Sequence, residues 1–297
     1  MKFKEKFSSF TRTLINYDLY MPNVMIRYKG IVQIHHAMGE HLGRYQHFAE
    51  YLARDGFIVV VSDFPGHGMS LHNYEQGYFG SGDATVNLVE DMQRLRNIIA
   101  SRYPDLPYFI IGNELGSVVL RKYIAKYGDY IQGCILMATC GKVKNANIGK
   151  VFLKGEVLLR GNMHRSKTLK KRLSKTNPYI TYDLDELAKY QDDPFTGFVY
   201  TNQAYFDILK LIKEVTSLHT IEKIPSYLSI LIVSGANDVF GRLGKGPQWL
   251  YNVLVNNGVK DVSLKLYNES YQDILHDKQR QQVYQDILDW LSERTYI

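Results

Sequence analysis

One glutamate in this sequence stands in a setting that could support covalent chemistry. Glu114 lies between Gly112 and Gly116, directly after an apolar run at residues 108–111. Glycines at this spacing let the chain turn sharply from a strand into a helix, so that the strand and the helix can approach each other. A carboxylate held on such a turn could act as a nucleophile, as other side chains do in covalent catalysis. The turn is therefore a candidate site.

The elements that must position this glutamate follow a regular alternation. Short apolar runs predict strands at residues 30–35, 57–61, 108–111, 134–137, 229–234 and 262–267. Between these runs, apolar residues recur at helical spacing, and Asp83 stands where it would cap one of the helices. The alternation predicts an α/β fold in which helices flank a mostly parallel sheet.

Residues 141–225 depart from this rhythm, because they are helical in pattern but strongly basic. The stretch from Lys142 to Lys175 carries a net charge of +10, whereas the rest of the chain carries −4. Ligands of open α/β sheets bind at the carboxyl ends of the strands. We therefore predict that residues 141–225 form a helical lid over a core made of residues 1–140 and 226–297.

Composition narrows the class of protein further. Apolar residues make up 45% of the chain, which is enough for a sizeable core. No run approaches the roughly 18 apolar residues of a membrane span or has the pattern of a signal peptide. Cys134 and Cys140 are too far apart for a disulfide in an extended chain. These features predict a cytoplasmic protein, either free or peripheral to the membrane. Positive charge confined to one segment argues against a general nucleic-acid binder.

Several blocks of sequence, taken together, resemble one family. Three of them read HAMGEHLGRY at residues 36–45, DFPGHGMS at residues 63–70 and GNELGS at residues 112–117. Three more follow in the family's order, namely DDPFTGF, SGANDVFGRLGKG and VYQDILDWL at residues 192–198, 234–246 and 283–291. From about residue 15 to residue 293, the chain resembles the monoacylglycerol lipase and lysophospholipase-like branch of the α/β-hydrolases, which is sometimes grouped with serine aminopeptidases.

This resemblance implies a catalytic triad, but two of its three positions carry other residues. The family's nucleophile is the serine of G-x-S-x-G, and Glu114 stands in its place. The family's histidine base falls on Gln272, which cannot take a proton, whereas the acid position holds Asp238. The amides that would form the oxyanion hole belong to Met38 and Leu115.

Neighbouring residues have ordinary structural interpretations. Ser117 lies one turn into the helix and is expected to be a small packing residue, and Asp238 could simply cap backbone amides. His276 lies four residues beyond Gln272, and we expect a surface or capping role for it.

A second group of histidines has the residue type of a metal site. His35, His36 and His41 lie close together in the sequence, but no cysteine accompanies them. The resemblance accounts for them as part of the family's loop architecture. We therefore predict no metal ion and no other cofactor.

These replacements leave three hypotheses for function. The first is a non-catalytic relative that keeps a pocket for an acyl-type ligand or a protein partner, because losing one triad member typically costs on the order of 10⁴-fold in rate. The second is a carboxylic-ester hydrolase with Glu114 as its nucleophile, as aspartate serves in the dehalogenase and epoxide-hydrolase branches. That route still needs a base, which Gln272 does not supply. The third is an ordinary esterase of the family whose replaced residues are compensated elsewhere.

Two structural expectations follow. A carboxylate oxygen of Glu114 should reach the Leu115 and Met38 amides, so that the side chain imitates an acyl-serine. The predicted lid carries apolar residues among its lysines, a pattern compatible with an anionic membrane surface or an acidic partner. The competing interpretation is a solvated basic helix whose apolar side packs on the core. The apolar residues in question are Phe152, Leu153, Val157, Leu158 and Leu159.

Overall fold

The structure is a computed structural model that describes residues 1–23, 27–71, 73, 75–142, 146–166 and 180–295. Its centre is one eight-stranded sheet with the strand order β1-β2-β4-β3-β5-β6-β7-β8. The last six strands in that order are parallel, and the α/β class predicted from the sequence is confirmed. They are β4 (Phe57–Ser62), β3 (Gly30–His35), β5 (Tyr108–Asn113), β6 (Gly133–Met137), β7 (Ser229–Gly235) and β8 (Val262–Tyr267).

An antiparallel hairpin at the edge of the sheet was not predicted from the sequence. It consists of β1 (Lys2–Ser8) and β2 (Leu14–Tyr20), and β2 continues the sheet by pairing antiparallel with β4. Most of β1 is exposed, and only Phe7 of that strand is buried. An edge strand with lysines in solvent has no continuous apolar run, so it lacks the signal by which the inner strands were found.

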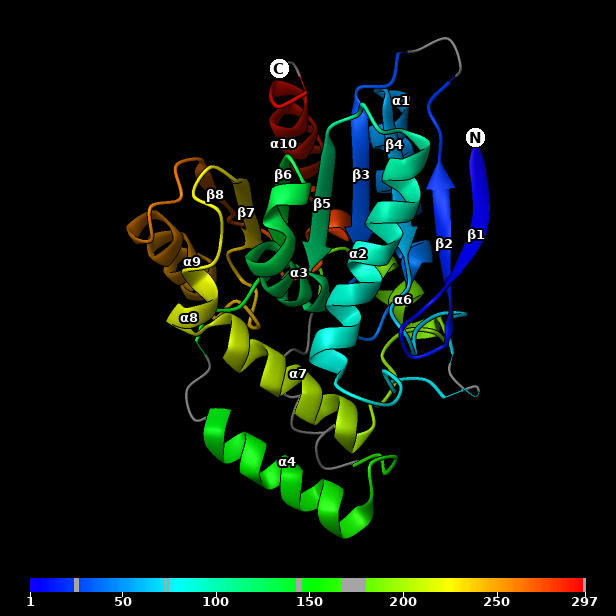
Figure 1. Cartoon of the computed structure of the whole chain (residues 1–297), viewed down its shortest axis with the longest axis vertical. Coiled ribbons are helices and arrows are strands. Elements are labelled where there is room, and N and C mark those ends of the chain that lie inside the picture. Colours follow the sequence, from blue (N-terminus) through cyan, green and yellow to red (C-terminus); the bar gives the residue numbers. More distant parts are fainter. Residues whose placement is uncertain (24–26, 72, 74, 143–145, 167–179, 296–297) are drawn as a thin grey trace.

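Helices cover both faces of the sheet (Figure 1). On one face, α1 (Gln46–Arg54) and α10 (Arg280–Glu293) bury apolar side chains in a shared cluster. On the other face, α2 (Ala84–Arg102), α3 (Leu115–Tyr127) and α9 (Lys245–Asn256) do the same. Asp83 caps α2 as predicted, because its side chain accepts a hydrogen bond from the Thr85 amide.

The described parts of the chain between β6 and β7 are largely helical. It contains α4 (Ala146–Arg160), α6 (Leu184–Asp192), α7 (Asn202–Val215) and α8 (Leu218–Ile221). Figure 1 shows α7 and α4 beyond the end of the sheet toward which β3 and β5 point. This is where the lid was expected, although part of the predicted lid, residues 143–145 and 167–179, lies outside the described residues. The division into core and lid stays a prediction.

Short helical turns and the cysteines complete the fold. Three 3₁₀ helices lie among the described residues, η1 (Leu42–Tyr45), η2 (Gly128–Tyr130) and η3 (Ile274–His276). Cys134 and Cys140 are both free and buried. None of the helices in the described part of the chain is long and apolar enough to cross a membrane.

Candidate active site

Glu114 lies on the turn between β5 and α3, where the sequence predicts a sharp bend. Its backbone has a φ of 44° and a ψ of −100°, a strained conformation for a residue with a side chain. A Cβ atom on Gly112 would lie 2.4 Å from the carbonyl oxygen of Gly116. A Cβ on Gly116 would lie 2.3 Å from the carbonyl oxygen of His35. The bend therefore requires glycine at both flanking positions.

The carboxyl group of Glu114 turns back toward the loop that follows β3. Its Oε2 accepts a hydrogen bond from the Met38 amide at 3.0 Å, and the side chain of Gln272 also hydrogen-bonds to it. Among the described residues, the Leu115 amide makes no hydrogen bond with this carboxyl. The expected acyl-serine geometry thus holds for Met38 and is wrong for Leu115.

Burial changes the acidity of Glu114. The side chain is only 4% exposed. Its removal from water, together with the negative charges of Asp238 and Glu40, raises the pKa of Glu114 to about 8, against the hydrogen bonds from Met38 and Gln272. The carboxyl group is therefore mostly protonated at neutral pH. A protonated carboxyl is a poor nucleophile.

Asp238, at the predicted acid position, lies in the loop after β7 and is fully buried. Its Oδ1 accepts a hydrogen bond from the Phe240 amide at 2.8 Å, so it caps its own loop. Burial raises the pKa of Asp238 to about 6, although hydrogen bonds from Gly241 and Phe240 oppose the rise. Within the described chain, no histidine forms a hydrogen bond with Asp238.

His276 is held by two partners outside the triad positions. It is 8% exposed, so the expectation of a surface position is wrong. Its Nδ1 lies 2.7 Å from Asp273 Oδ1, and its Nε2 lies 2.8 Å from the carbonyl oxygen of Arg44. Burial opposes protonation, but the charge of Asp273 raises the pKa of His276 above its usual value. Both ring nitrogens are committed to holding two loops together.

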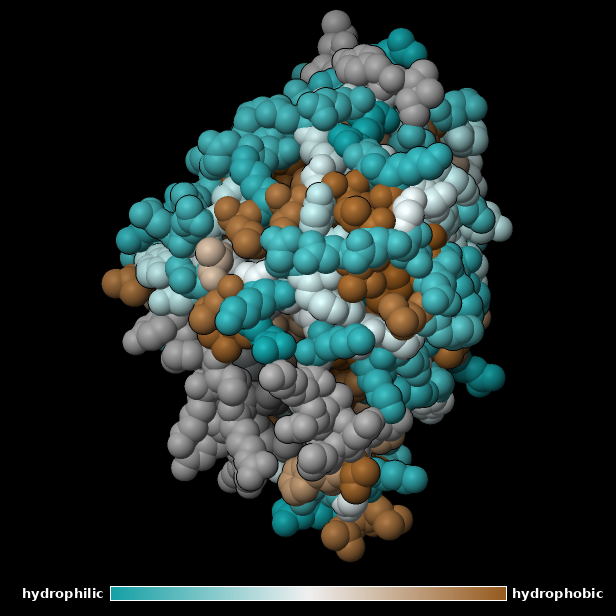
Figure 2. All heavy atoms as spheres, turned by 90° about the vertical axis from the view of Figure 1, so that its left-hand side faces the viewer, coloured by the Kyte–Doolittle hydropathy of each residue, from teal (hydrophilic) through white to brown (hydrophobic). Residues whose placement is uncertain are grey.

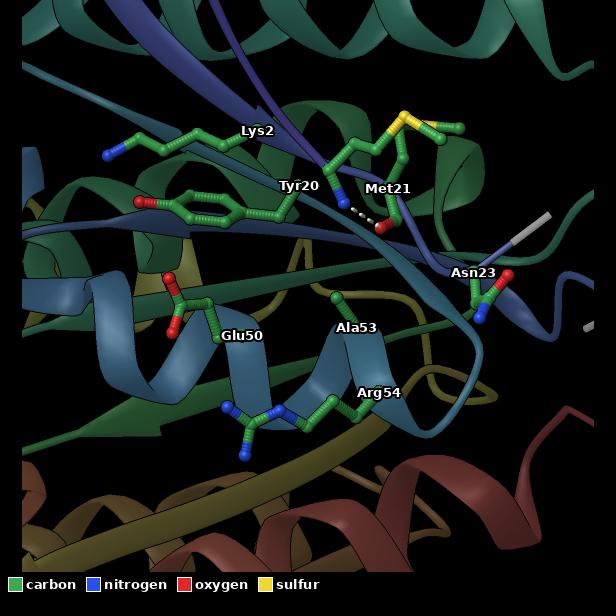
Figure 3. A pocket seen from close by; sticks show the side chains of 8 residues that line it. Lys2, Tyr20, Met21, Asn23, Glu50, Ala53 and Arg54 are labelled. Atoms are coloured by element: carbon green, nitrogen blue, oxygen red, sulfur yellow. Dashed lines mark hydrogen bonds between the residues drawn. The ribbon is translucent and has the colours of Figure 1, made fainter.

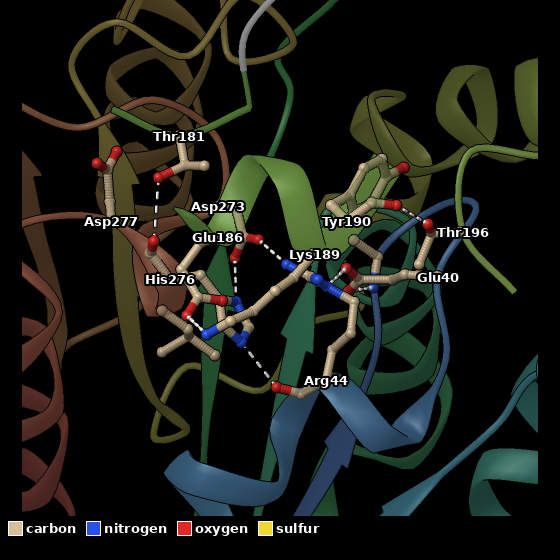
Figure 4. Close-up of polar contacts among 12 residues, drawn as sticks. Glu40, Arg44, Thr181, Glu186, Lys189, Tyr190, Thr196, Asp273, His276 and Asp277 are labelled. Carbon is tan, nitrogen blue, oxygen red and sulfur yellow. Dashed lines mark hydrogen bonds and ion pairs between the residues drawn. The ribbon is translucent and has the colours of Figure 1, made fainter. Parts of the chain in front are cut away.

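His276 belongs to a buried ionic network that sequence reasoning did not find (Figure 4). Arg44 Nη2 lies 2.5 Å from Asp273 Oδ2, and Arg44 Nε lies 3.1 Å from Glu40 Oε2. Although burial opposes it, the charges of His276 and Arg44 hold the pKa of Asp273 at about 2. Arg44 and Asp273 are 229 residues apart in the chain, so no local pattern indicates their pairing.

The three histidines considered for a metal site each have separate partners. His35 contacts Ser62 and Gln33, and His36 Nε2 accepts a hydrogen bond from the Phe64 amide at 3.0 Å. His41 Nε2 lies 2.8 Å from Asp193. No group of three or more His, Cys, Asp or Glu side chains in the described part of the chain could hold a metal ion.

A small cavity of about 30 Å³ lies against Glu114, which is room for about one water molecule. Met38, Asn113, Gln272 and Asp273 also line it. The structure thus brings the predicted nucleophile position, base position and one oxyanion amide to the same point.

A separate cavity of about 640 Å³ lies between α1 and the end of β2 (Figure 3). Lys2, Tyr20, Glu50 and Arg54 are among its lining residues, and none of the predicted site residues is. The Lys2 ammonium is already paired with Asp18 at 2.7 Å. This cavity is therefore distinct from the candidate active site.

Comparison with known proteins agrees with this fold. Residues 27–279 match the family described as serine aminopeptidase, S33. The chain belongs to this family of α/β-hydrolases. A monoacylglycerol lipase of Mycolicibacterium smegmatis is 25% identical, over 93% of this chain and 92% of its own length. A carboxyl esterase from Bacillus coagulans, solved in complex with glycerol, is 27% identical with a TM-score of 0.91 over 99% of both chains.

Family membership also extends to longer proteins. An uncharacterized abhydrolase domain-containing protein of Dictyostelium discoideum is 26% identical over 87% of this chain, but the match spans only 26% of that protein. The relatives together confirm the predicted resemblance: the chain is an α/β-hydrolase of the monoglyceride lipase and esterase type.

Proposed function

We propose that this α/β-hydrolase is non-catalytic and binds an acyl-type ligand without cleaving it. The observation that carries the proposal is the contact between Glu114 Oε2 and the Met38 amide at 3.0 Å. In a serine hydrolase of this fold, that amide would stabilise the oxyanion of the reacting ester. Here the carboxyl group of Glu114 accepts the hydrogen bond of that amide, and the nucleophilic serine is absent.

The alternative of hydrolysis through Glu114 has less support. A carboxylate nucleophile must be ionised, whereas burial raises the pKa of Glu114 to about 8. An ester intermediate on Glu114 would also need a base to activate water. Gln272 cannot act as that base, and both nitrogens of His276 are engaged by Asp273 and Arg44.

The class of ligand is inferred from the relatives. The matching proteins include monoglyceride lipases and a carboxyl esterase bound to glycerol. Their names support an ester or lipid-like small molecule as the ligand of this chain. No nucleic acid, metal ion or other cofactor enters the proposal.

The test compares the native chain with a chain whose triad is rebuilt. The native protein should not react with a fluorophosphonate probe and should not turn over p-nitrophenyl butyrate. The double variant Glu114→Ser with Gln272→His should gain both properties, because Asp238 remains in the loop after β7. The two single variants serve as controls and should stay near the background rate. Turnover by the native chain that Glu114→Ala abolishes would instead establish the carboxylate route.

We also propose that α4 contacts an anionic membrane surface. Val151, Leu158 and Leu159 are 74%, 84% and 83% exposed, and Lys154 and Arg160 are exposed beside them. Figure 2 shows hydrophobic atoms at the lower end of the molecule, where α4 lies. An amphipathic helix with apolar and basic residues is typical of an interfacial segment.

Vesicle sedimentation tests this contact. Binding to anionic vesicles should exceed binding to neutral vesicles and should weaken with added salt. The pair of changes Leu158→Ser and Leu159→Ser should reduce it further. The matched control is Leu218→Ser on α8, which is 59% exposed and should leave binding unchanged. Equal binding to both vesicle types would contradict the proposal.

A further inference from the structure

The cavity beside Glu114 differs in polarity from an oxyanion hole. An oxyanion hole presents hydrogen-bond donors to a carbonyl oxygen. Here the donors around the cavity are largely committed. The Met38 amide donates to Glu114, the Ala37 amide donates to Glu40 at 2.8 Å, and the Tyr190 hydroxyl donates to the Gly39 carbonyl at 3.4 Å.

Asn113, which also lines this cavity, carries an uncommitted acceptor. The Tyr45 hydroxyl donates its single proton to Glu40, so it can only accept from Asn113 Nδ2, which lies 2.8 Å away. This pairing fixes the orientation of the Asn113 amide. Asn113 Oδ1 is then left with no hydrogen-bond partner among the described residues, although the side chain is only 3% exposed. A buried acceptor of this kind requires a donor.

Acidic side chains surround this acceptor. Glu40, Glu114 and Asp273 all line the cavity. Arg44 lies against Glu40 and Asp273, and His276 lies against Asp273, whereas Glu114 has no cationic partner among the described residues. The negative charge of Asp238 further raises the pKa of Glu114. Within the described chain, the site therefore has a free acceptor on Asn113 and a carboxyl group on Glu114 without a cationic partner.

We infer that this cavity is a subsite for a primary ammonium head group. This inference rests on the proposed function, because it assigns the ligand chemistry of a site that no longer cleaves esters. The ammonium would donate to Asn113 Oδ1 and to the Glu114 carboxyl. An ester carbonyl only accepts hydrogen bonds, so it could not pair with Asn113 Oδ1. The cavity volume of about 30 Å³ suits an ammonium group, with the rest of the ligand extending past half-buried Met38 and Ile180.

Binding must change the protonation of Glu114. The free site holds the proton on this carboxyl at neutral pH, since burial raises the pKa of Glu114 to about 8. A bound cation favours the ionised carboxylate. The balance is one protonated carboxyl plus one ammonium giving one ion pair plus one proton in solution. Arg44 and His276 stay paired with Asp273 and Glu40 and take no part.

Titration of the full chain with n-butylammonium, n-butanol and butyrate tests the inference. Calorimetry at pH 7 in two buffers of different ionisation enthalpy counts the protons released. Butylammonium should bind at least about tenfold more tightly than butanol, with release of close to one proton, and butyrate should not bind. In carboxyl carbon NMR, the signal of Glu114 should titrate at lower pH when butylammonium is present.

Variants separate the subsite from general binding to acidic surfaces. Glu114→Gln keeps the shape of the side chain and should abolish both the proton release and the preference for the amine. Asn113→Ala should lower the affinity for butylammonium by about tenfold. Thermal unfolding is used to confirm that the variant is folded. The control Glu222→Gln removes an exposed carboxyl and should change nothing.

The outcomes distinguish this inference from the proposed function. If butanol and butylammonium bind equally, or if neither binds and Glu114 keeps its pKa, the cavity holds water only and the inference is overturned. The proposed function is then unaffected. If the native chain hydrolyses p-nitrophenyl butyrate, the proposed function fails whatever the amine titration shows.

Discussion

Asp273 and Glu114 line the same cavity and are nearly equally buried, at 7% and 4% exposure, yet their acidities differ greatly. The pKa of Asp273 is held at about 2, whereas that of Glu114 is raised to about 8. Burial penalises the ionised form of both carboxyl groups. The difference is that Asp273 lies 2.5 Å from Arg44 and 2.7 Å from His276, while Glu114 has only neutral hydrogen-bond donors.

This contrast shows what a buried carboxyl group needs in order to remain ionised. Neutral donors such as the Met38 amide lower a pKa, but here they do not offset desolvation and two nearby acids. A pair of cations does. Asp273 is therefore part of a stabilising ionic network, whereas Glu114 is a buried acid without a cationic partner among the described residues.

The largest effect is expected from removing the shared cation. Arg44→Met should destabilise the fold by about 3–5 kcal/mol at pH 7, because it leaves Glu40 and Asp273 buried without their partner. The loss should shrink in acid as Asp273 of the variant becomes protonated. Urea unfolding at pH 7 and at pH 4 measures both values. An equal loss at the two pH values would show that the charge of Arg44 is not what keeps Asp273 ionised.

A pH-dependent effect is expected from Glu114→Gln. The folded chain holds the Glu114 proton more tightly than the unfolded chain. The contribution of this proton to the free energy of unfolding is therefore full below pH 4.5 and is lost as pH rises toward 8. The variant has no proton to lose. Its free energy of unfolding should exceed that of the native chain by a few kcal/mol at pH 8, at about 1.4 kcal/mol for each tenfold difference in proton affinity. Thermal unfolding between pH 5 and 8 tests this, and parallel curves would argue against a buried protonated Glu114.

A smaller effect is expected at His276, where the contribution to the free energy of unfolding also decreases as pH rises. His276→Gln should cost about 1–3 kcal/mol near pH 6, because it weakens the bonds to Asp273 and to the Arg44 carbonyl. The pKa of His276 is raised in the folded chain, so its charge contributes fully below the usual value of 6.5. That contribution is lost as pH rises through the folded-state pKa. Urea unfolding should show the two proteins converging in part at alkaline pH; a constant gap would mean that the charge is not involved.

The smallest effect is expected for a solvent-exposed arginine–aspartate ion pair, the exposed counterpart of Arg44 and Asp273. Arg280 lies 2.8 Å from Asp183, and the two side chains are 39% and 23% exposed. Arg280→Ala should cost no more than about 1 kcal/mol, since water and salt screen the pair. The same urea experiment measures it beside Arg44→Met. A loss comparable to that of Arg44→Met would show that burial is not what separates the two pairs.

Local patterns were sufficient for much of this molecule. The inner parallel strands, the cap at Asp83 and the bend at Glu114 were predicted because apolar periodicity, capping residues and flanking glycines act over a few residues. The edge hairpin of β1 and β2 was missed because its pattern is diluted by exposed lysines. The boundaries of the lid and its contact with membranes stay predictions.

The sequence by itself determined that Glu114 and Gln272 stand where a nucleophile and a base would be needed. It could not determine the protonation of Glu114 or the commitment of His276, since both depend on partners brought from distant loops. Arg44 comes from the loop after β3, and Asp273 comes from the loop after β8. Ionisation inside a protein is decided by desolvation and by charges within a few ångströms, and only the tertiary structure brings those charges together.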